Sequence, residues 1–113
     1  MQNVLTLKEV MDKCGSLKIF EKRSATDDYI ELVFHNEETG EWNKLLSDFF
    51  GPAAKPPKAK PSKNDISITK VYGGIRPDQT LFRKDFDDAM IIAMFWPWQD
   101  GAHTTLKIFL IRK

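Results

Sequence analysis

Hydrophobic positions along the chain recur with two periods, one typical of helices and one typical of strands. Residues 7–14 place apolar side chains at i, i+3, i+4 and i+7, after a Thr-x-x-Glu sequence that favours a helix start. The sequence EWNKLLSDFFGP, which begins at Glu41, has a wider apolar stripe and ends in Gly-Pro. Both segments are predicted to be helices, and the second is predicted to anchor the core. Its stripe consists of Trp42, Leu45, Leu46, Phe49 and Phe50.

Period-two alternation predicts the strands. The predicted strands are 16–23, 28–35, 66–72 and 104–113, and LFRKDF at 81–86 adds an optional short edge strand. The inward-facing residues are expected to be Leu17 and Ile19 in the first, Ile30, Leu32 and Phe34 in the second, and Ile66, Ile68 and Tyr72 in the third. The turn sequence SATDD between the first two strands predicts that they pair in antiparallel fashion.

The sequence AMIIAMFW at 89–96 is apolar on both faces and has two interpretations. Its β-branched and aromatic content favours a buried strand, which the turn QDG would join to 104–113 as a hairpin. The alternative is a buried helix beginning near Asp85, with Asp87 and Asp88 favourable in its first turn. In a strand, Pro97 cannot donate a ladder hydrogen bond, so the strand is expected to end or bulge there.

The elements together predict an α+β fold in the order α-β-β-α-β-(β)-β-β. The expected architecture is an antiparallel sheet of four to six strands with two helices on one face. Residues 1–113 are predicted to form a single small domain, since either half alone is too short for a sufficient core and has neither disulfides nor metal ligands. A mobile Pro/Lys-rich loop at about 52–64 is expected to interrupt it.

The sequence GPAAKPPKAKPSKN at 51–64 contains four prolines, four lysines and no acidic residue. It can be interpreted as a domain hinge, a basic arm or a mobile loop, and the mobile loop is favoured. As an arm, Lys55, Lys58, Lys60 and Lys63 would contact at most four phosphates. Because no aromatic residue is interleaved to stack on bases, nucleic-acid binding through this loop would be weak and independent of sequence.

Composition excludes several classes of protein. The net charge is +1, which gives no general argument for nucleic acid or an anionic membrane as a partner. The single cysteine, Cys14, cannot form an intrachain disulfide, so no oxidising compartment is implied. The longest apolar run, 89–98, has ten residues and contains Pro97, which is too short to span a bilayer. We therefore expect a cytoplasmic protein without a membrane partner.

No residue pattern identifies a reaction. His35 and His103 each stand alone, and Cys14 lies on the apolar stripe of the first helix, so neither a metal site of known spacing nor a cofactor is predicted. No serine lies in a nucleophile motif, and no catalytic residue is assigned. A small enzyme that uses the Asp85–Asp88 cluster with the Gly73–Gly74 turn is the most distant of three functional hypotheses.

The string MFWPWQDG at 94–101 is the strongest candidate for an interaction surface. Phe95, Trp96 and Trp98 lie at a predicted strand end, and alternation prevents Phe95 and Trp96 from being buried on the same face. Coverage of these aromatic residues by the stripes of both helices is the favoured interpretation of their environment, and an exposed interaction surface is the alternative. The leading hypothesis is a non-catalytic protein-binding or regulatory domain that contacts a protein partner or a second copy. A weak nucleic-acid accessory protein that acts through residues 55–63 comes second.

Overall fold

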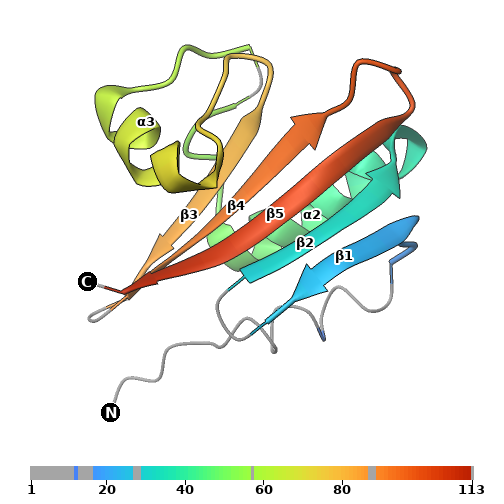
Figure 1. The fold of residues 1–113 in the computed structure, drawn as a ribbon, viewed down its shortest axis with the longest axis horizontal. Coiled ribbons are helices and arrows are strands. Elements are labelled where there is room, and N and C mark those ends of the chain that lie inside the picture. The colour runs from blue at the N-terminus through green and yellow to red at the C-terminus, as the bar shows by residue number, and fades with distance from the viewer. Residues whose placement is uncertain (1–11, 13–16, 27–28, 57, 87–88, 113) are drawn as a thin grey trace.

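The computed structural model describes Asp12 and residues 17–26, 29–56, 58–86 and 89–112, and its central feature is one antiparallel sheet (Figure 1). The strands are β1 (Glu21–Ala25), β2 (Tyr29–His35), β3 (Thr80–Asp85), β4 (Ala89–Pro97) and β5 (His103–Arg112). The helices are α2 (Thr39–Phe50) and α3 (Lys63–Thr69), with short 3-10 turns η1 (Asn36–Glu38) and η2 (Lys70–Tyr72). The strand order is β1-β2-β5-β4-β3, so strands from both sides of residues 51–64 share one sheet.

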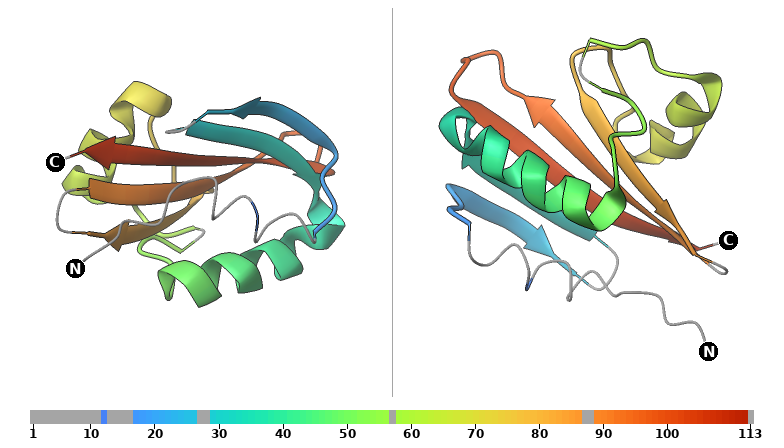
Figure 2. Two further views of the ribbon diagram at one scale, coloured as in Figure 1. Left: turned by 90° about the horizontal axis from the view of Figure 1, so that it is seen from below. Right: turned by 180° about the vertical axis from the view of Figure 1, so that it is seen from behind.

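The predicted α+β class and its antiparallel sheet are confirmed, with five strands. The expected helix at 7–14 falls outside the described residues, Asp12 excepted. α2 covers one face of the sheet, whereas α3 lies on the opposite face beside β3 and β4 (Figure 2). Of the two helices predicted on one face, α2 is therefore the one that the structure describes, and α3 is an additional helix on the other face.

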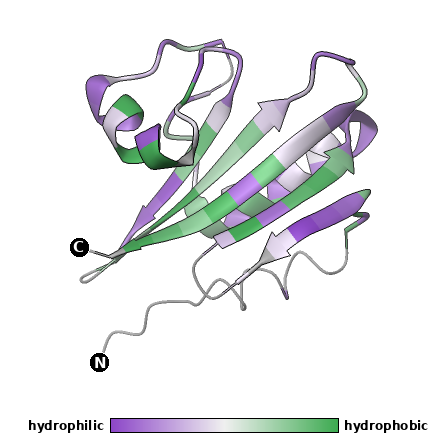
Figure 3. Ribbon diagram, viewed as in Figure 1, coloured by the Kyte–Doolittle hydropathy of each residue, from purple (hydrophilic) through white to green (hydrophobic). Residues whose placement is uncertain are grey.

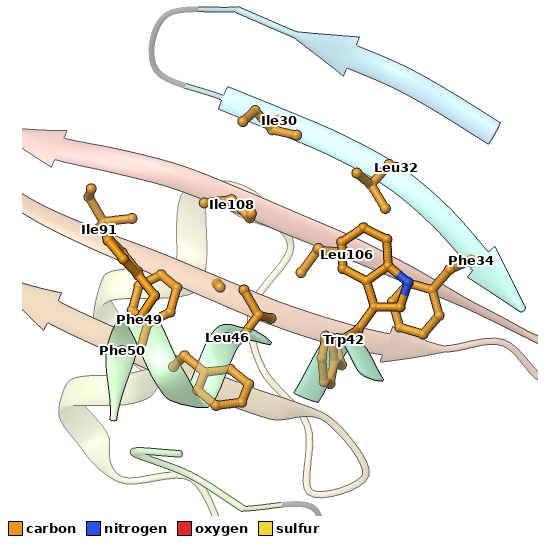
Figure 4. Packing of buried hydrophobic residues seen from close by; sticks show 13 residues of the cluster. Ile30, Leu32, Phe34, Trp42, Leu46, Phe49, Phe50, Ile91, Leu106 and Ile108 are labelled. Carbon is orange, nitrogen blue, oxygen red and sulfur yellow. The ribbon is translucent and has the colours of Figure 1, made fainter. Parts of the chain in front are cut away.

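The face beneath α2 is an aromatic core, as the stripe in its sequence predicts. Trp42, Leu46, Phe49 and Phe50 are buried, and Gly51 ends the helix with a φ of 83°. Figure 4 shows these side chains directed toward Ile30, Leu32 and Phe34 of β2 and toward residues of β4 and β5. The ring of Phe34 stacks on Trp42 with centroids 5.2 Å apart and meets Phe95 edge-on at 5.6 Å.

β4 is a buried interior strand between β5 and β3, which decides between the two interpretations of 89–96. Its residues from Ala89 to Phe95 are all buried; Ile91 packs in the core beneath α2, and Ile92 packs in a second core on the opposite face. The prediction of a buried strand is confirmed, as are its end at Pro97 and its hairpin with β5. Figure 3 shows the contrast between this hydrophobic strand and the hydrophilic outer strand β1.

The prediction of a strand at 66–72 is wrong, because this segment forms α3 and η2. Ser62 begins the helix with a capping box: its Oγ accepts from the Asp65 N–H, and the Asp65 carboxylate accepts from the Ser62 N–H, each at 3.0 Å. This reciprocal cap favours helix over strand. In consequence Ile66 and Ile68 do not share a face: Ile66 is half exposed and Ile68 packs against the second core.

The first strand begins later than predicted. β1 covers Glu21–Ala25 instead of 16–23, and its register shifts between Lys22 and Ser24 where it pairs with β2. Leu17 and Ile19 precede the strand, yet both pack against the core beneath α2, so their expected inward direction is confirmed. The predicted edge strand at 81–86 is present as β3, which places Leu81 and Phe82 in different cores.

Candidate functional site

The chain's only two histidines meet on the face of the sheet opposite α2. His35 ends β2, His103 begins β5, and the two are direct partners in the antiparallel register. Both strand ends lie at the same end of the sheet in Figure 1. In β2 the even-numbered residues Ile30, Leu32 and Phe34 point into the core beneath α2. Strand alternation therefore directs His35 to the opposite face.

Aromatic rings surround the two imidazoles. The ring centroids of His35 and His103 are 5.0 Å apart, and Phe20 lies 4.9 Å from His35 and 4.6 Å from His103. Trp98 also packs on His103, with ring centroids 4.9 Å apart. We call Phe20, His35, Trp98 and His103 the histidine–aromatic cluster. The side chain of Phe20 is exposed in spite of these contacts, with 50% of its area accessible.

Hydrogen bonds from the β4–β5 turn fix the orientation of this cluster. Asp100 Oδ2 lies 2.6 Å from His103 Nδ1, and Asp100 Oδ1 accepts from the N–H groups of Ala102 and His103. These bonds, with the Ala102 N–H contributing most, hold the pKa of Asp100 below its usual value. Trp98 donates its indole N–H to Thr105 Oγ1 at 2.7 Å.

Arg23 of β1 links the cluster to the charged part of the same face. Its guanidinium carbon lies 5.3 Å from the centroid of Trp98, a cation–π arrangement. It also forms ion pairs with Glu21 at 3.5 Å and Glu31 at 3.6 Å. Tyr29 donates its hydroxyl to Glu31 at 2.5 Å. The charges beside the cluster are therefore compensated within the chain.

The three aromatic residues that sequence analysis selected occupy different environments. Phe95 is buried beneath α2, in contact with Phe34 and with Phe82 at 5.7 Å, so it belongs to the core. Trp96 is half-buried and packs against the second core. Trp98 is half-buried in the histidine–aromatic cluster. Of the three, Trp98 is the one that belongs to the cluster containing the exposed Phe20 ring.

Trp96 lies between two cations. Lys107 Nζ is 3.5 Å from the Trp96 ring centroid and the Arg76 guanidinium is 5.9 Å from it. Burial lowers the pKa of Lys107, and the carboxylate of Glu31 opposes that shift. The buried indole N–H of Trp96 has no hydrogen-bond partner. Because the ring is enclosed by these side chains, its arrangement is that of a packing element.

The four lysines of the Pro/Lys-rich segment also separate into two environments. Lys55 is buried, and its ammonium group donates to the backbone carbonyls of Pro56, Pro77 and Gln79. Burial lowers its pKa, opposed by the charges of Asp78 and Asp65. By contrast Lys58, Lys60 and Lys63 are exposed. The backbone of Lys55 also exchanges two hydrogen bonds with Leu81 of β3, so the segment is attached to the sheet at that point.

Two cavities lie outside the cluster. One of 410 Å³ lies beside α2 and is lined by Leu17, Glu41, Lys44, Leu45, Asp48 and Phe49. A smaller one of 270 Å³ is lined by Asn36, Thr39, Asp78, Thr80, Phe95, Pro97 and Thr104. Neither wall includes a histidine, so the imidazoles lie outside both cavities.

The aspartate cluster can be followed only at Asp85, because residues 87–88 fall outside the described residues. Asp85 is exposed at the end of β3 and pairs with Arg83 on the same strand, with Nε 3.1 Å from Oδ2. Within the described ranges, no group of three or more His, Cys, Asp or Glu side chains is arranged to hold a metal ion. A charge-paired surface aspartate gives no support to the enzyme hypothesis.

Sequence reasoning treated the two histidines as isolated and did not select Phe20 or Arg23. The alternation of 28–35 predicted that His35 lies on the face opposite Ile30, Leu32 and Phe34, but His103 lay outside the predicted strand 104–113 and was assigned to no face. The missing information was strand order: β2 and β5 are separated by α2, α3, β3 and β4 in the chain, and their pairing is not encoded in any local turn.

Comparison with known proteins adds no function: family models, curated proteins and solved structures give no match to the chain. Among the described residues, no helix has the length and apolar character needed to cross a membrane.

Proposed function

We propose that the protein is a non-catalytic protein-binding module of the cytoplasm, and that the histidine–aromatic cluster is the centre of its contact surface. The observation that carries the proposal is the exposure of Phe20. Half of its side-chain area is accessible although it packs on both imidazoles, so a partner would remove apolar surface from water there.

The composition of the surroundings supports this proposal. Trp and Arg are enriched among the residues that dominate binding energy. Trp98 contacts His103, which also contacts Phe20, and Arg23 lies over the Trp98 ring. The internal ion pairs of Arg23 keep it extended over the indole before any partner arrives. A surface held in its bound geometry loses less conformational entropy on association.

The test uses Phe20→Ala and Trp98→Ala, with Val71→Ala as the matched control. Val71 is an apolar side chain with 87% of its area exposed on η2, away from the cluster. The complex with the cellular partner, or the dimer if the partner is a second copy, should weaken at least tenfold in the first two variants and remain unchanged in the control. Sedimentation and affinity isolation with quantified recovery measure these outcomes.

Stability must be followed in the same variants. Because Phe20 is half exposed, its truncation should cost about 1 kcal/mol or less, and loss of the Trp98–Thr105 hydrogen bond should cost about 1 kcal/mol. A large stability loss with unchanged association would assign the cluster to packing. Equal loss of association in the Val71 control would place the contact surface elsewhere.

A further inference from the structure

We propose that His35 and His103 form a binding site for a divalent transition-metal ion of the Zn²⁺, Ni²⁺ or Cu²⁺ class. They are the only imidazoles in a chain of 113 residues, and 67 residues separate them in sequence. The fold nevertheless makes them direct cross-strand partners with ring centroids 5.0 Å apart. This inference rests on the geometry of the two rings and does not depend on the proposed protein-binding function.

The backbone pattern brings these two side chains close together. The Asn36 N–H donates to the Ala102 carbonyl, and the His103 carbonyl accepts from Trp98 on the β4 side. His35 and His103 therefore occupy a non-hydrogen-bonded pair of the β2–β5 ladder, the type in which facing side chains approach most closely. One ion at about 2.0–2.1 Å from a nitrogen of each ring fits between imidazoles at this separation.

Hydrogen bonding leaves suitable nitrogens free. Asp100 Oδ2 holds His103 Nδ1 at 2.6 Å, so Nε2 is left with its lone pair available. A carboxylate on the far nitrogen of a ligating histidine is the usual arrangement in metal sites, where it fixes the tautomer and raises ligand basicity. Among the described residues, no hydrogen bond engages the ring nitrogens of His35, and the ring faces that of His103.

Asp100 is itself held in position for this role. Its other carboxylate oxygen accepts from the N–H groups of Ala102 at 2.8 Å and His103 at 3.1 Å. The carboxylate that orients His103 is thus fixed by the turn backbone before any ion binds. Phe20 and Trp98 pack on the rings and limit their rotation, and 18% of the His103 side chain remains accessible.

The site has two protein ligands, because the described residues provide no third His, Cys, Asp or Glu side chain at ligand spacing. Water, or a donor atom from a bound partner, would complete the coordination. Such a site is weaker than a closed structural zinc site with four protein ligands. Nitrogen ligands favour Cu²⁺, Ni²⁺ and Zn²⁺ over Mg²⁺ and Ca²⁺, which prefer oxygen.

The test is a titration of the full chain, carrying Cys14→Ser to remove the thiol, with ZnCl₂ at pH 7.5. We expect one equivalent to bind and the ¹⁵N resonances of both imidazoles to shift together, whereas MgCl₂ produces neither effect. His35→Asn and His103→Asn should each weaken binding at least tenfold. Asp100→Asn should weaken it about 10- to 100-fold, because the far nitrogen loses its carboxylate.

Proton competition in the unmodified chain provides a readout that does not depend on a variant folding. Zinc affinity should fall as the pH is lowered, because protons compete with the metal ion for the imidazole nitrogens. The proposal is overturned if only one imidazole responds to zinc, or if either histidine variant binds as tightly as the parent chain. It is also overturned if no imidazole resonance moves when zinc is added to about 1 mM, a concentration that half-saturates a site with a Kd of that value.

Discussion

Gly73 lies directly against the indole ring of Trp96. A β-carbon built on Gly73 would lie 2.5 Å from Trp96 Cη2, which is closer than side chains approach, and the φ of Gly73 is 102°. The ring cannot move aside freely, since Lys107 lies 3.5 Å from its centroid and the other side packs on the second core. The glycine that ends η2 therefore sets the distance between this turn and β4.

Gly73→Ala is expected to destabilise the protein by about 2–5 kcal/mol. Positive φ costs an L-residue about 1–2 kcal/mol, and the overlap with a fixed ring adds about 1–3 kcal/mol. Gly74→Ala is the matched control, since its φ is 80° and its β-carbon would meet open space. The control should lose about 1–2 kcal/mol in urea unfolding. Equal losses of unfolding free energy in the two variants would mean that the Trp96 ring moves aside to accommodate the new β-carbon.

Lys55 is buried, although the Pro/Lys-rich composition of its segment predicts an exposed position. Lys55→Met should lower the free energy of unfolding by about 2 kcal/mol, because it leaves the carbonyls of Pro56, Pro77 and Gln79 without their donor. Lys58→Met, at an exposed position in the same segment, should change it by less than about 0.5 kcal/mol. Urea denaturation of the two variants measures the difference.

The pH dependence of that difference has a defined sign. The pKa of Lys55 is lowered in the folded state from its ordinary value of 10.5, so the folded chain releases this proton at a lower pH than the unfolded chain. The wild type should therefore gain stability relative to Lys55→Met as the pH rises through the folded pKa toward 10.5, with the gain complete above that value. A difference that declines over this range would contradict the lowered pKa.

Helices and strands could be predicted from the sequence where the local hydrophobic pattern agrees with the burial of the segment in the folded chain. The stripe from Trp42 to Phe50 predicts α2 because all of it faces one core. The segment 89–96, which is apolar on both faces, predicts a buried strand because it contributes side chains to both cores. The strand prediction for residues 66–72 was wrong because the spacing of Ile66 and Ile68 matches strand alternation, whereas the Ser62–Asp65 capping box favours a helix. A serine three residues before an aspartate was the signal available for that correction.

The site was less predictable than the fold, for a different physical reason. Phe95, Trp96 and Trp98 were grouped because they are close in sequence. In the fold, Phe95 lies in the core beneath α2, Trp96 packs against the second core, and Trp98 lies in the histidine–aromatic cluster. The cluster of His35 with His103 depends on the long-range β2–β5 pairing, which no local turn specifies. Contacts between distant segments follow from global packing, so residue spacing along the chain does not reveal them.

The number of exposed lysines in the Pro/Lys-rich segment sets the expected salt dependence of any nucleic-acid binding through it. With Lys55 buried, Lys58, Lys60 and Lys63 are the cations of the segment that can reach phosphates. Any binding to duplex DNA should then show a log–log salt slope of about −2.7 instead of the −3.6 or so of four contacts. Lys58→Gln, Lys60→Gln and Lys63→Gln in combination should abolish it. No mobility shift for wild type at 50 mM salt would end this hypothesis.

The pairing of β2 with β5 also predicts how the chain folds. This ladder joins Tyr29–His35, before the Pro/Lys-rich segment, to residues of β5 after it, and the core beneath α2 is built from both parts. We propose that residues 1–113 fold as one cooperative unit. Fragments 1–50 and 51–113 should each lack a sharp thermal transition, because each leaves one side of a shared core in water.

Circular dichroism of each fragment and of their mixture measures this cooperativity. Fragment 1–50 would contain α2 but lack β4 and β5, on which Trp42, Leu46 and Phe49 pack, so these side chains would be exposed to water. Mixing the two fragments should restore a cooperative transition whose midpoint rises with concentration, as expected for folding coupled to association. A sharp melt of either fragment alone would show two independently stable bodies joined by residues 51–64, and the shared sheet would then not be what stabilises them.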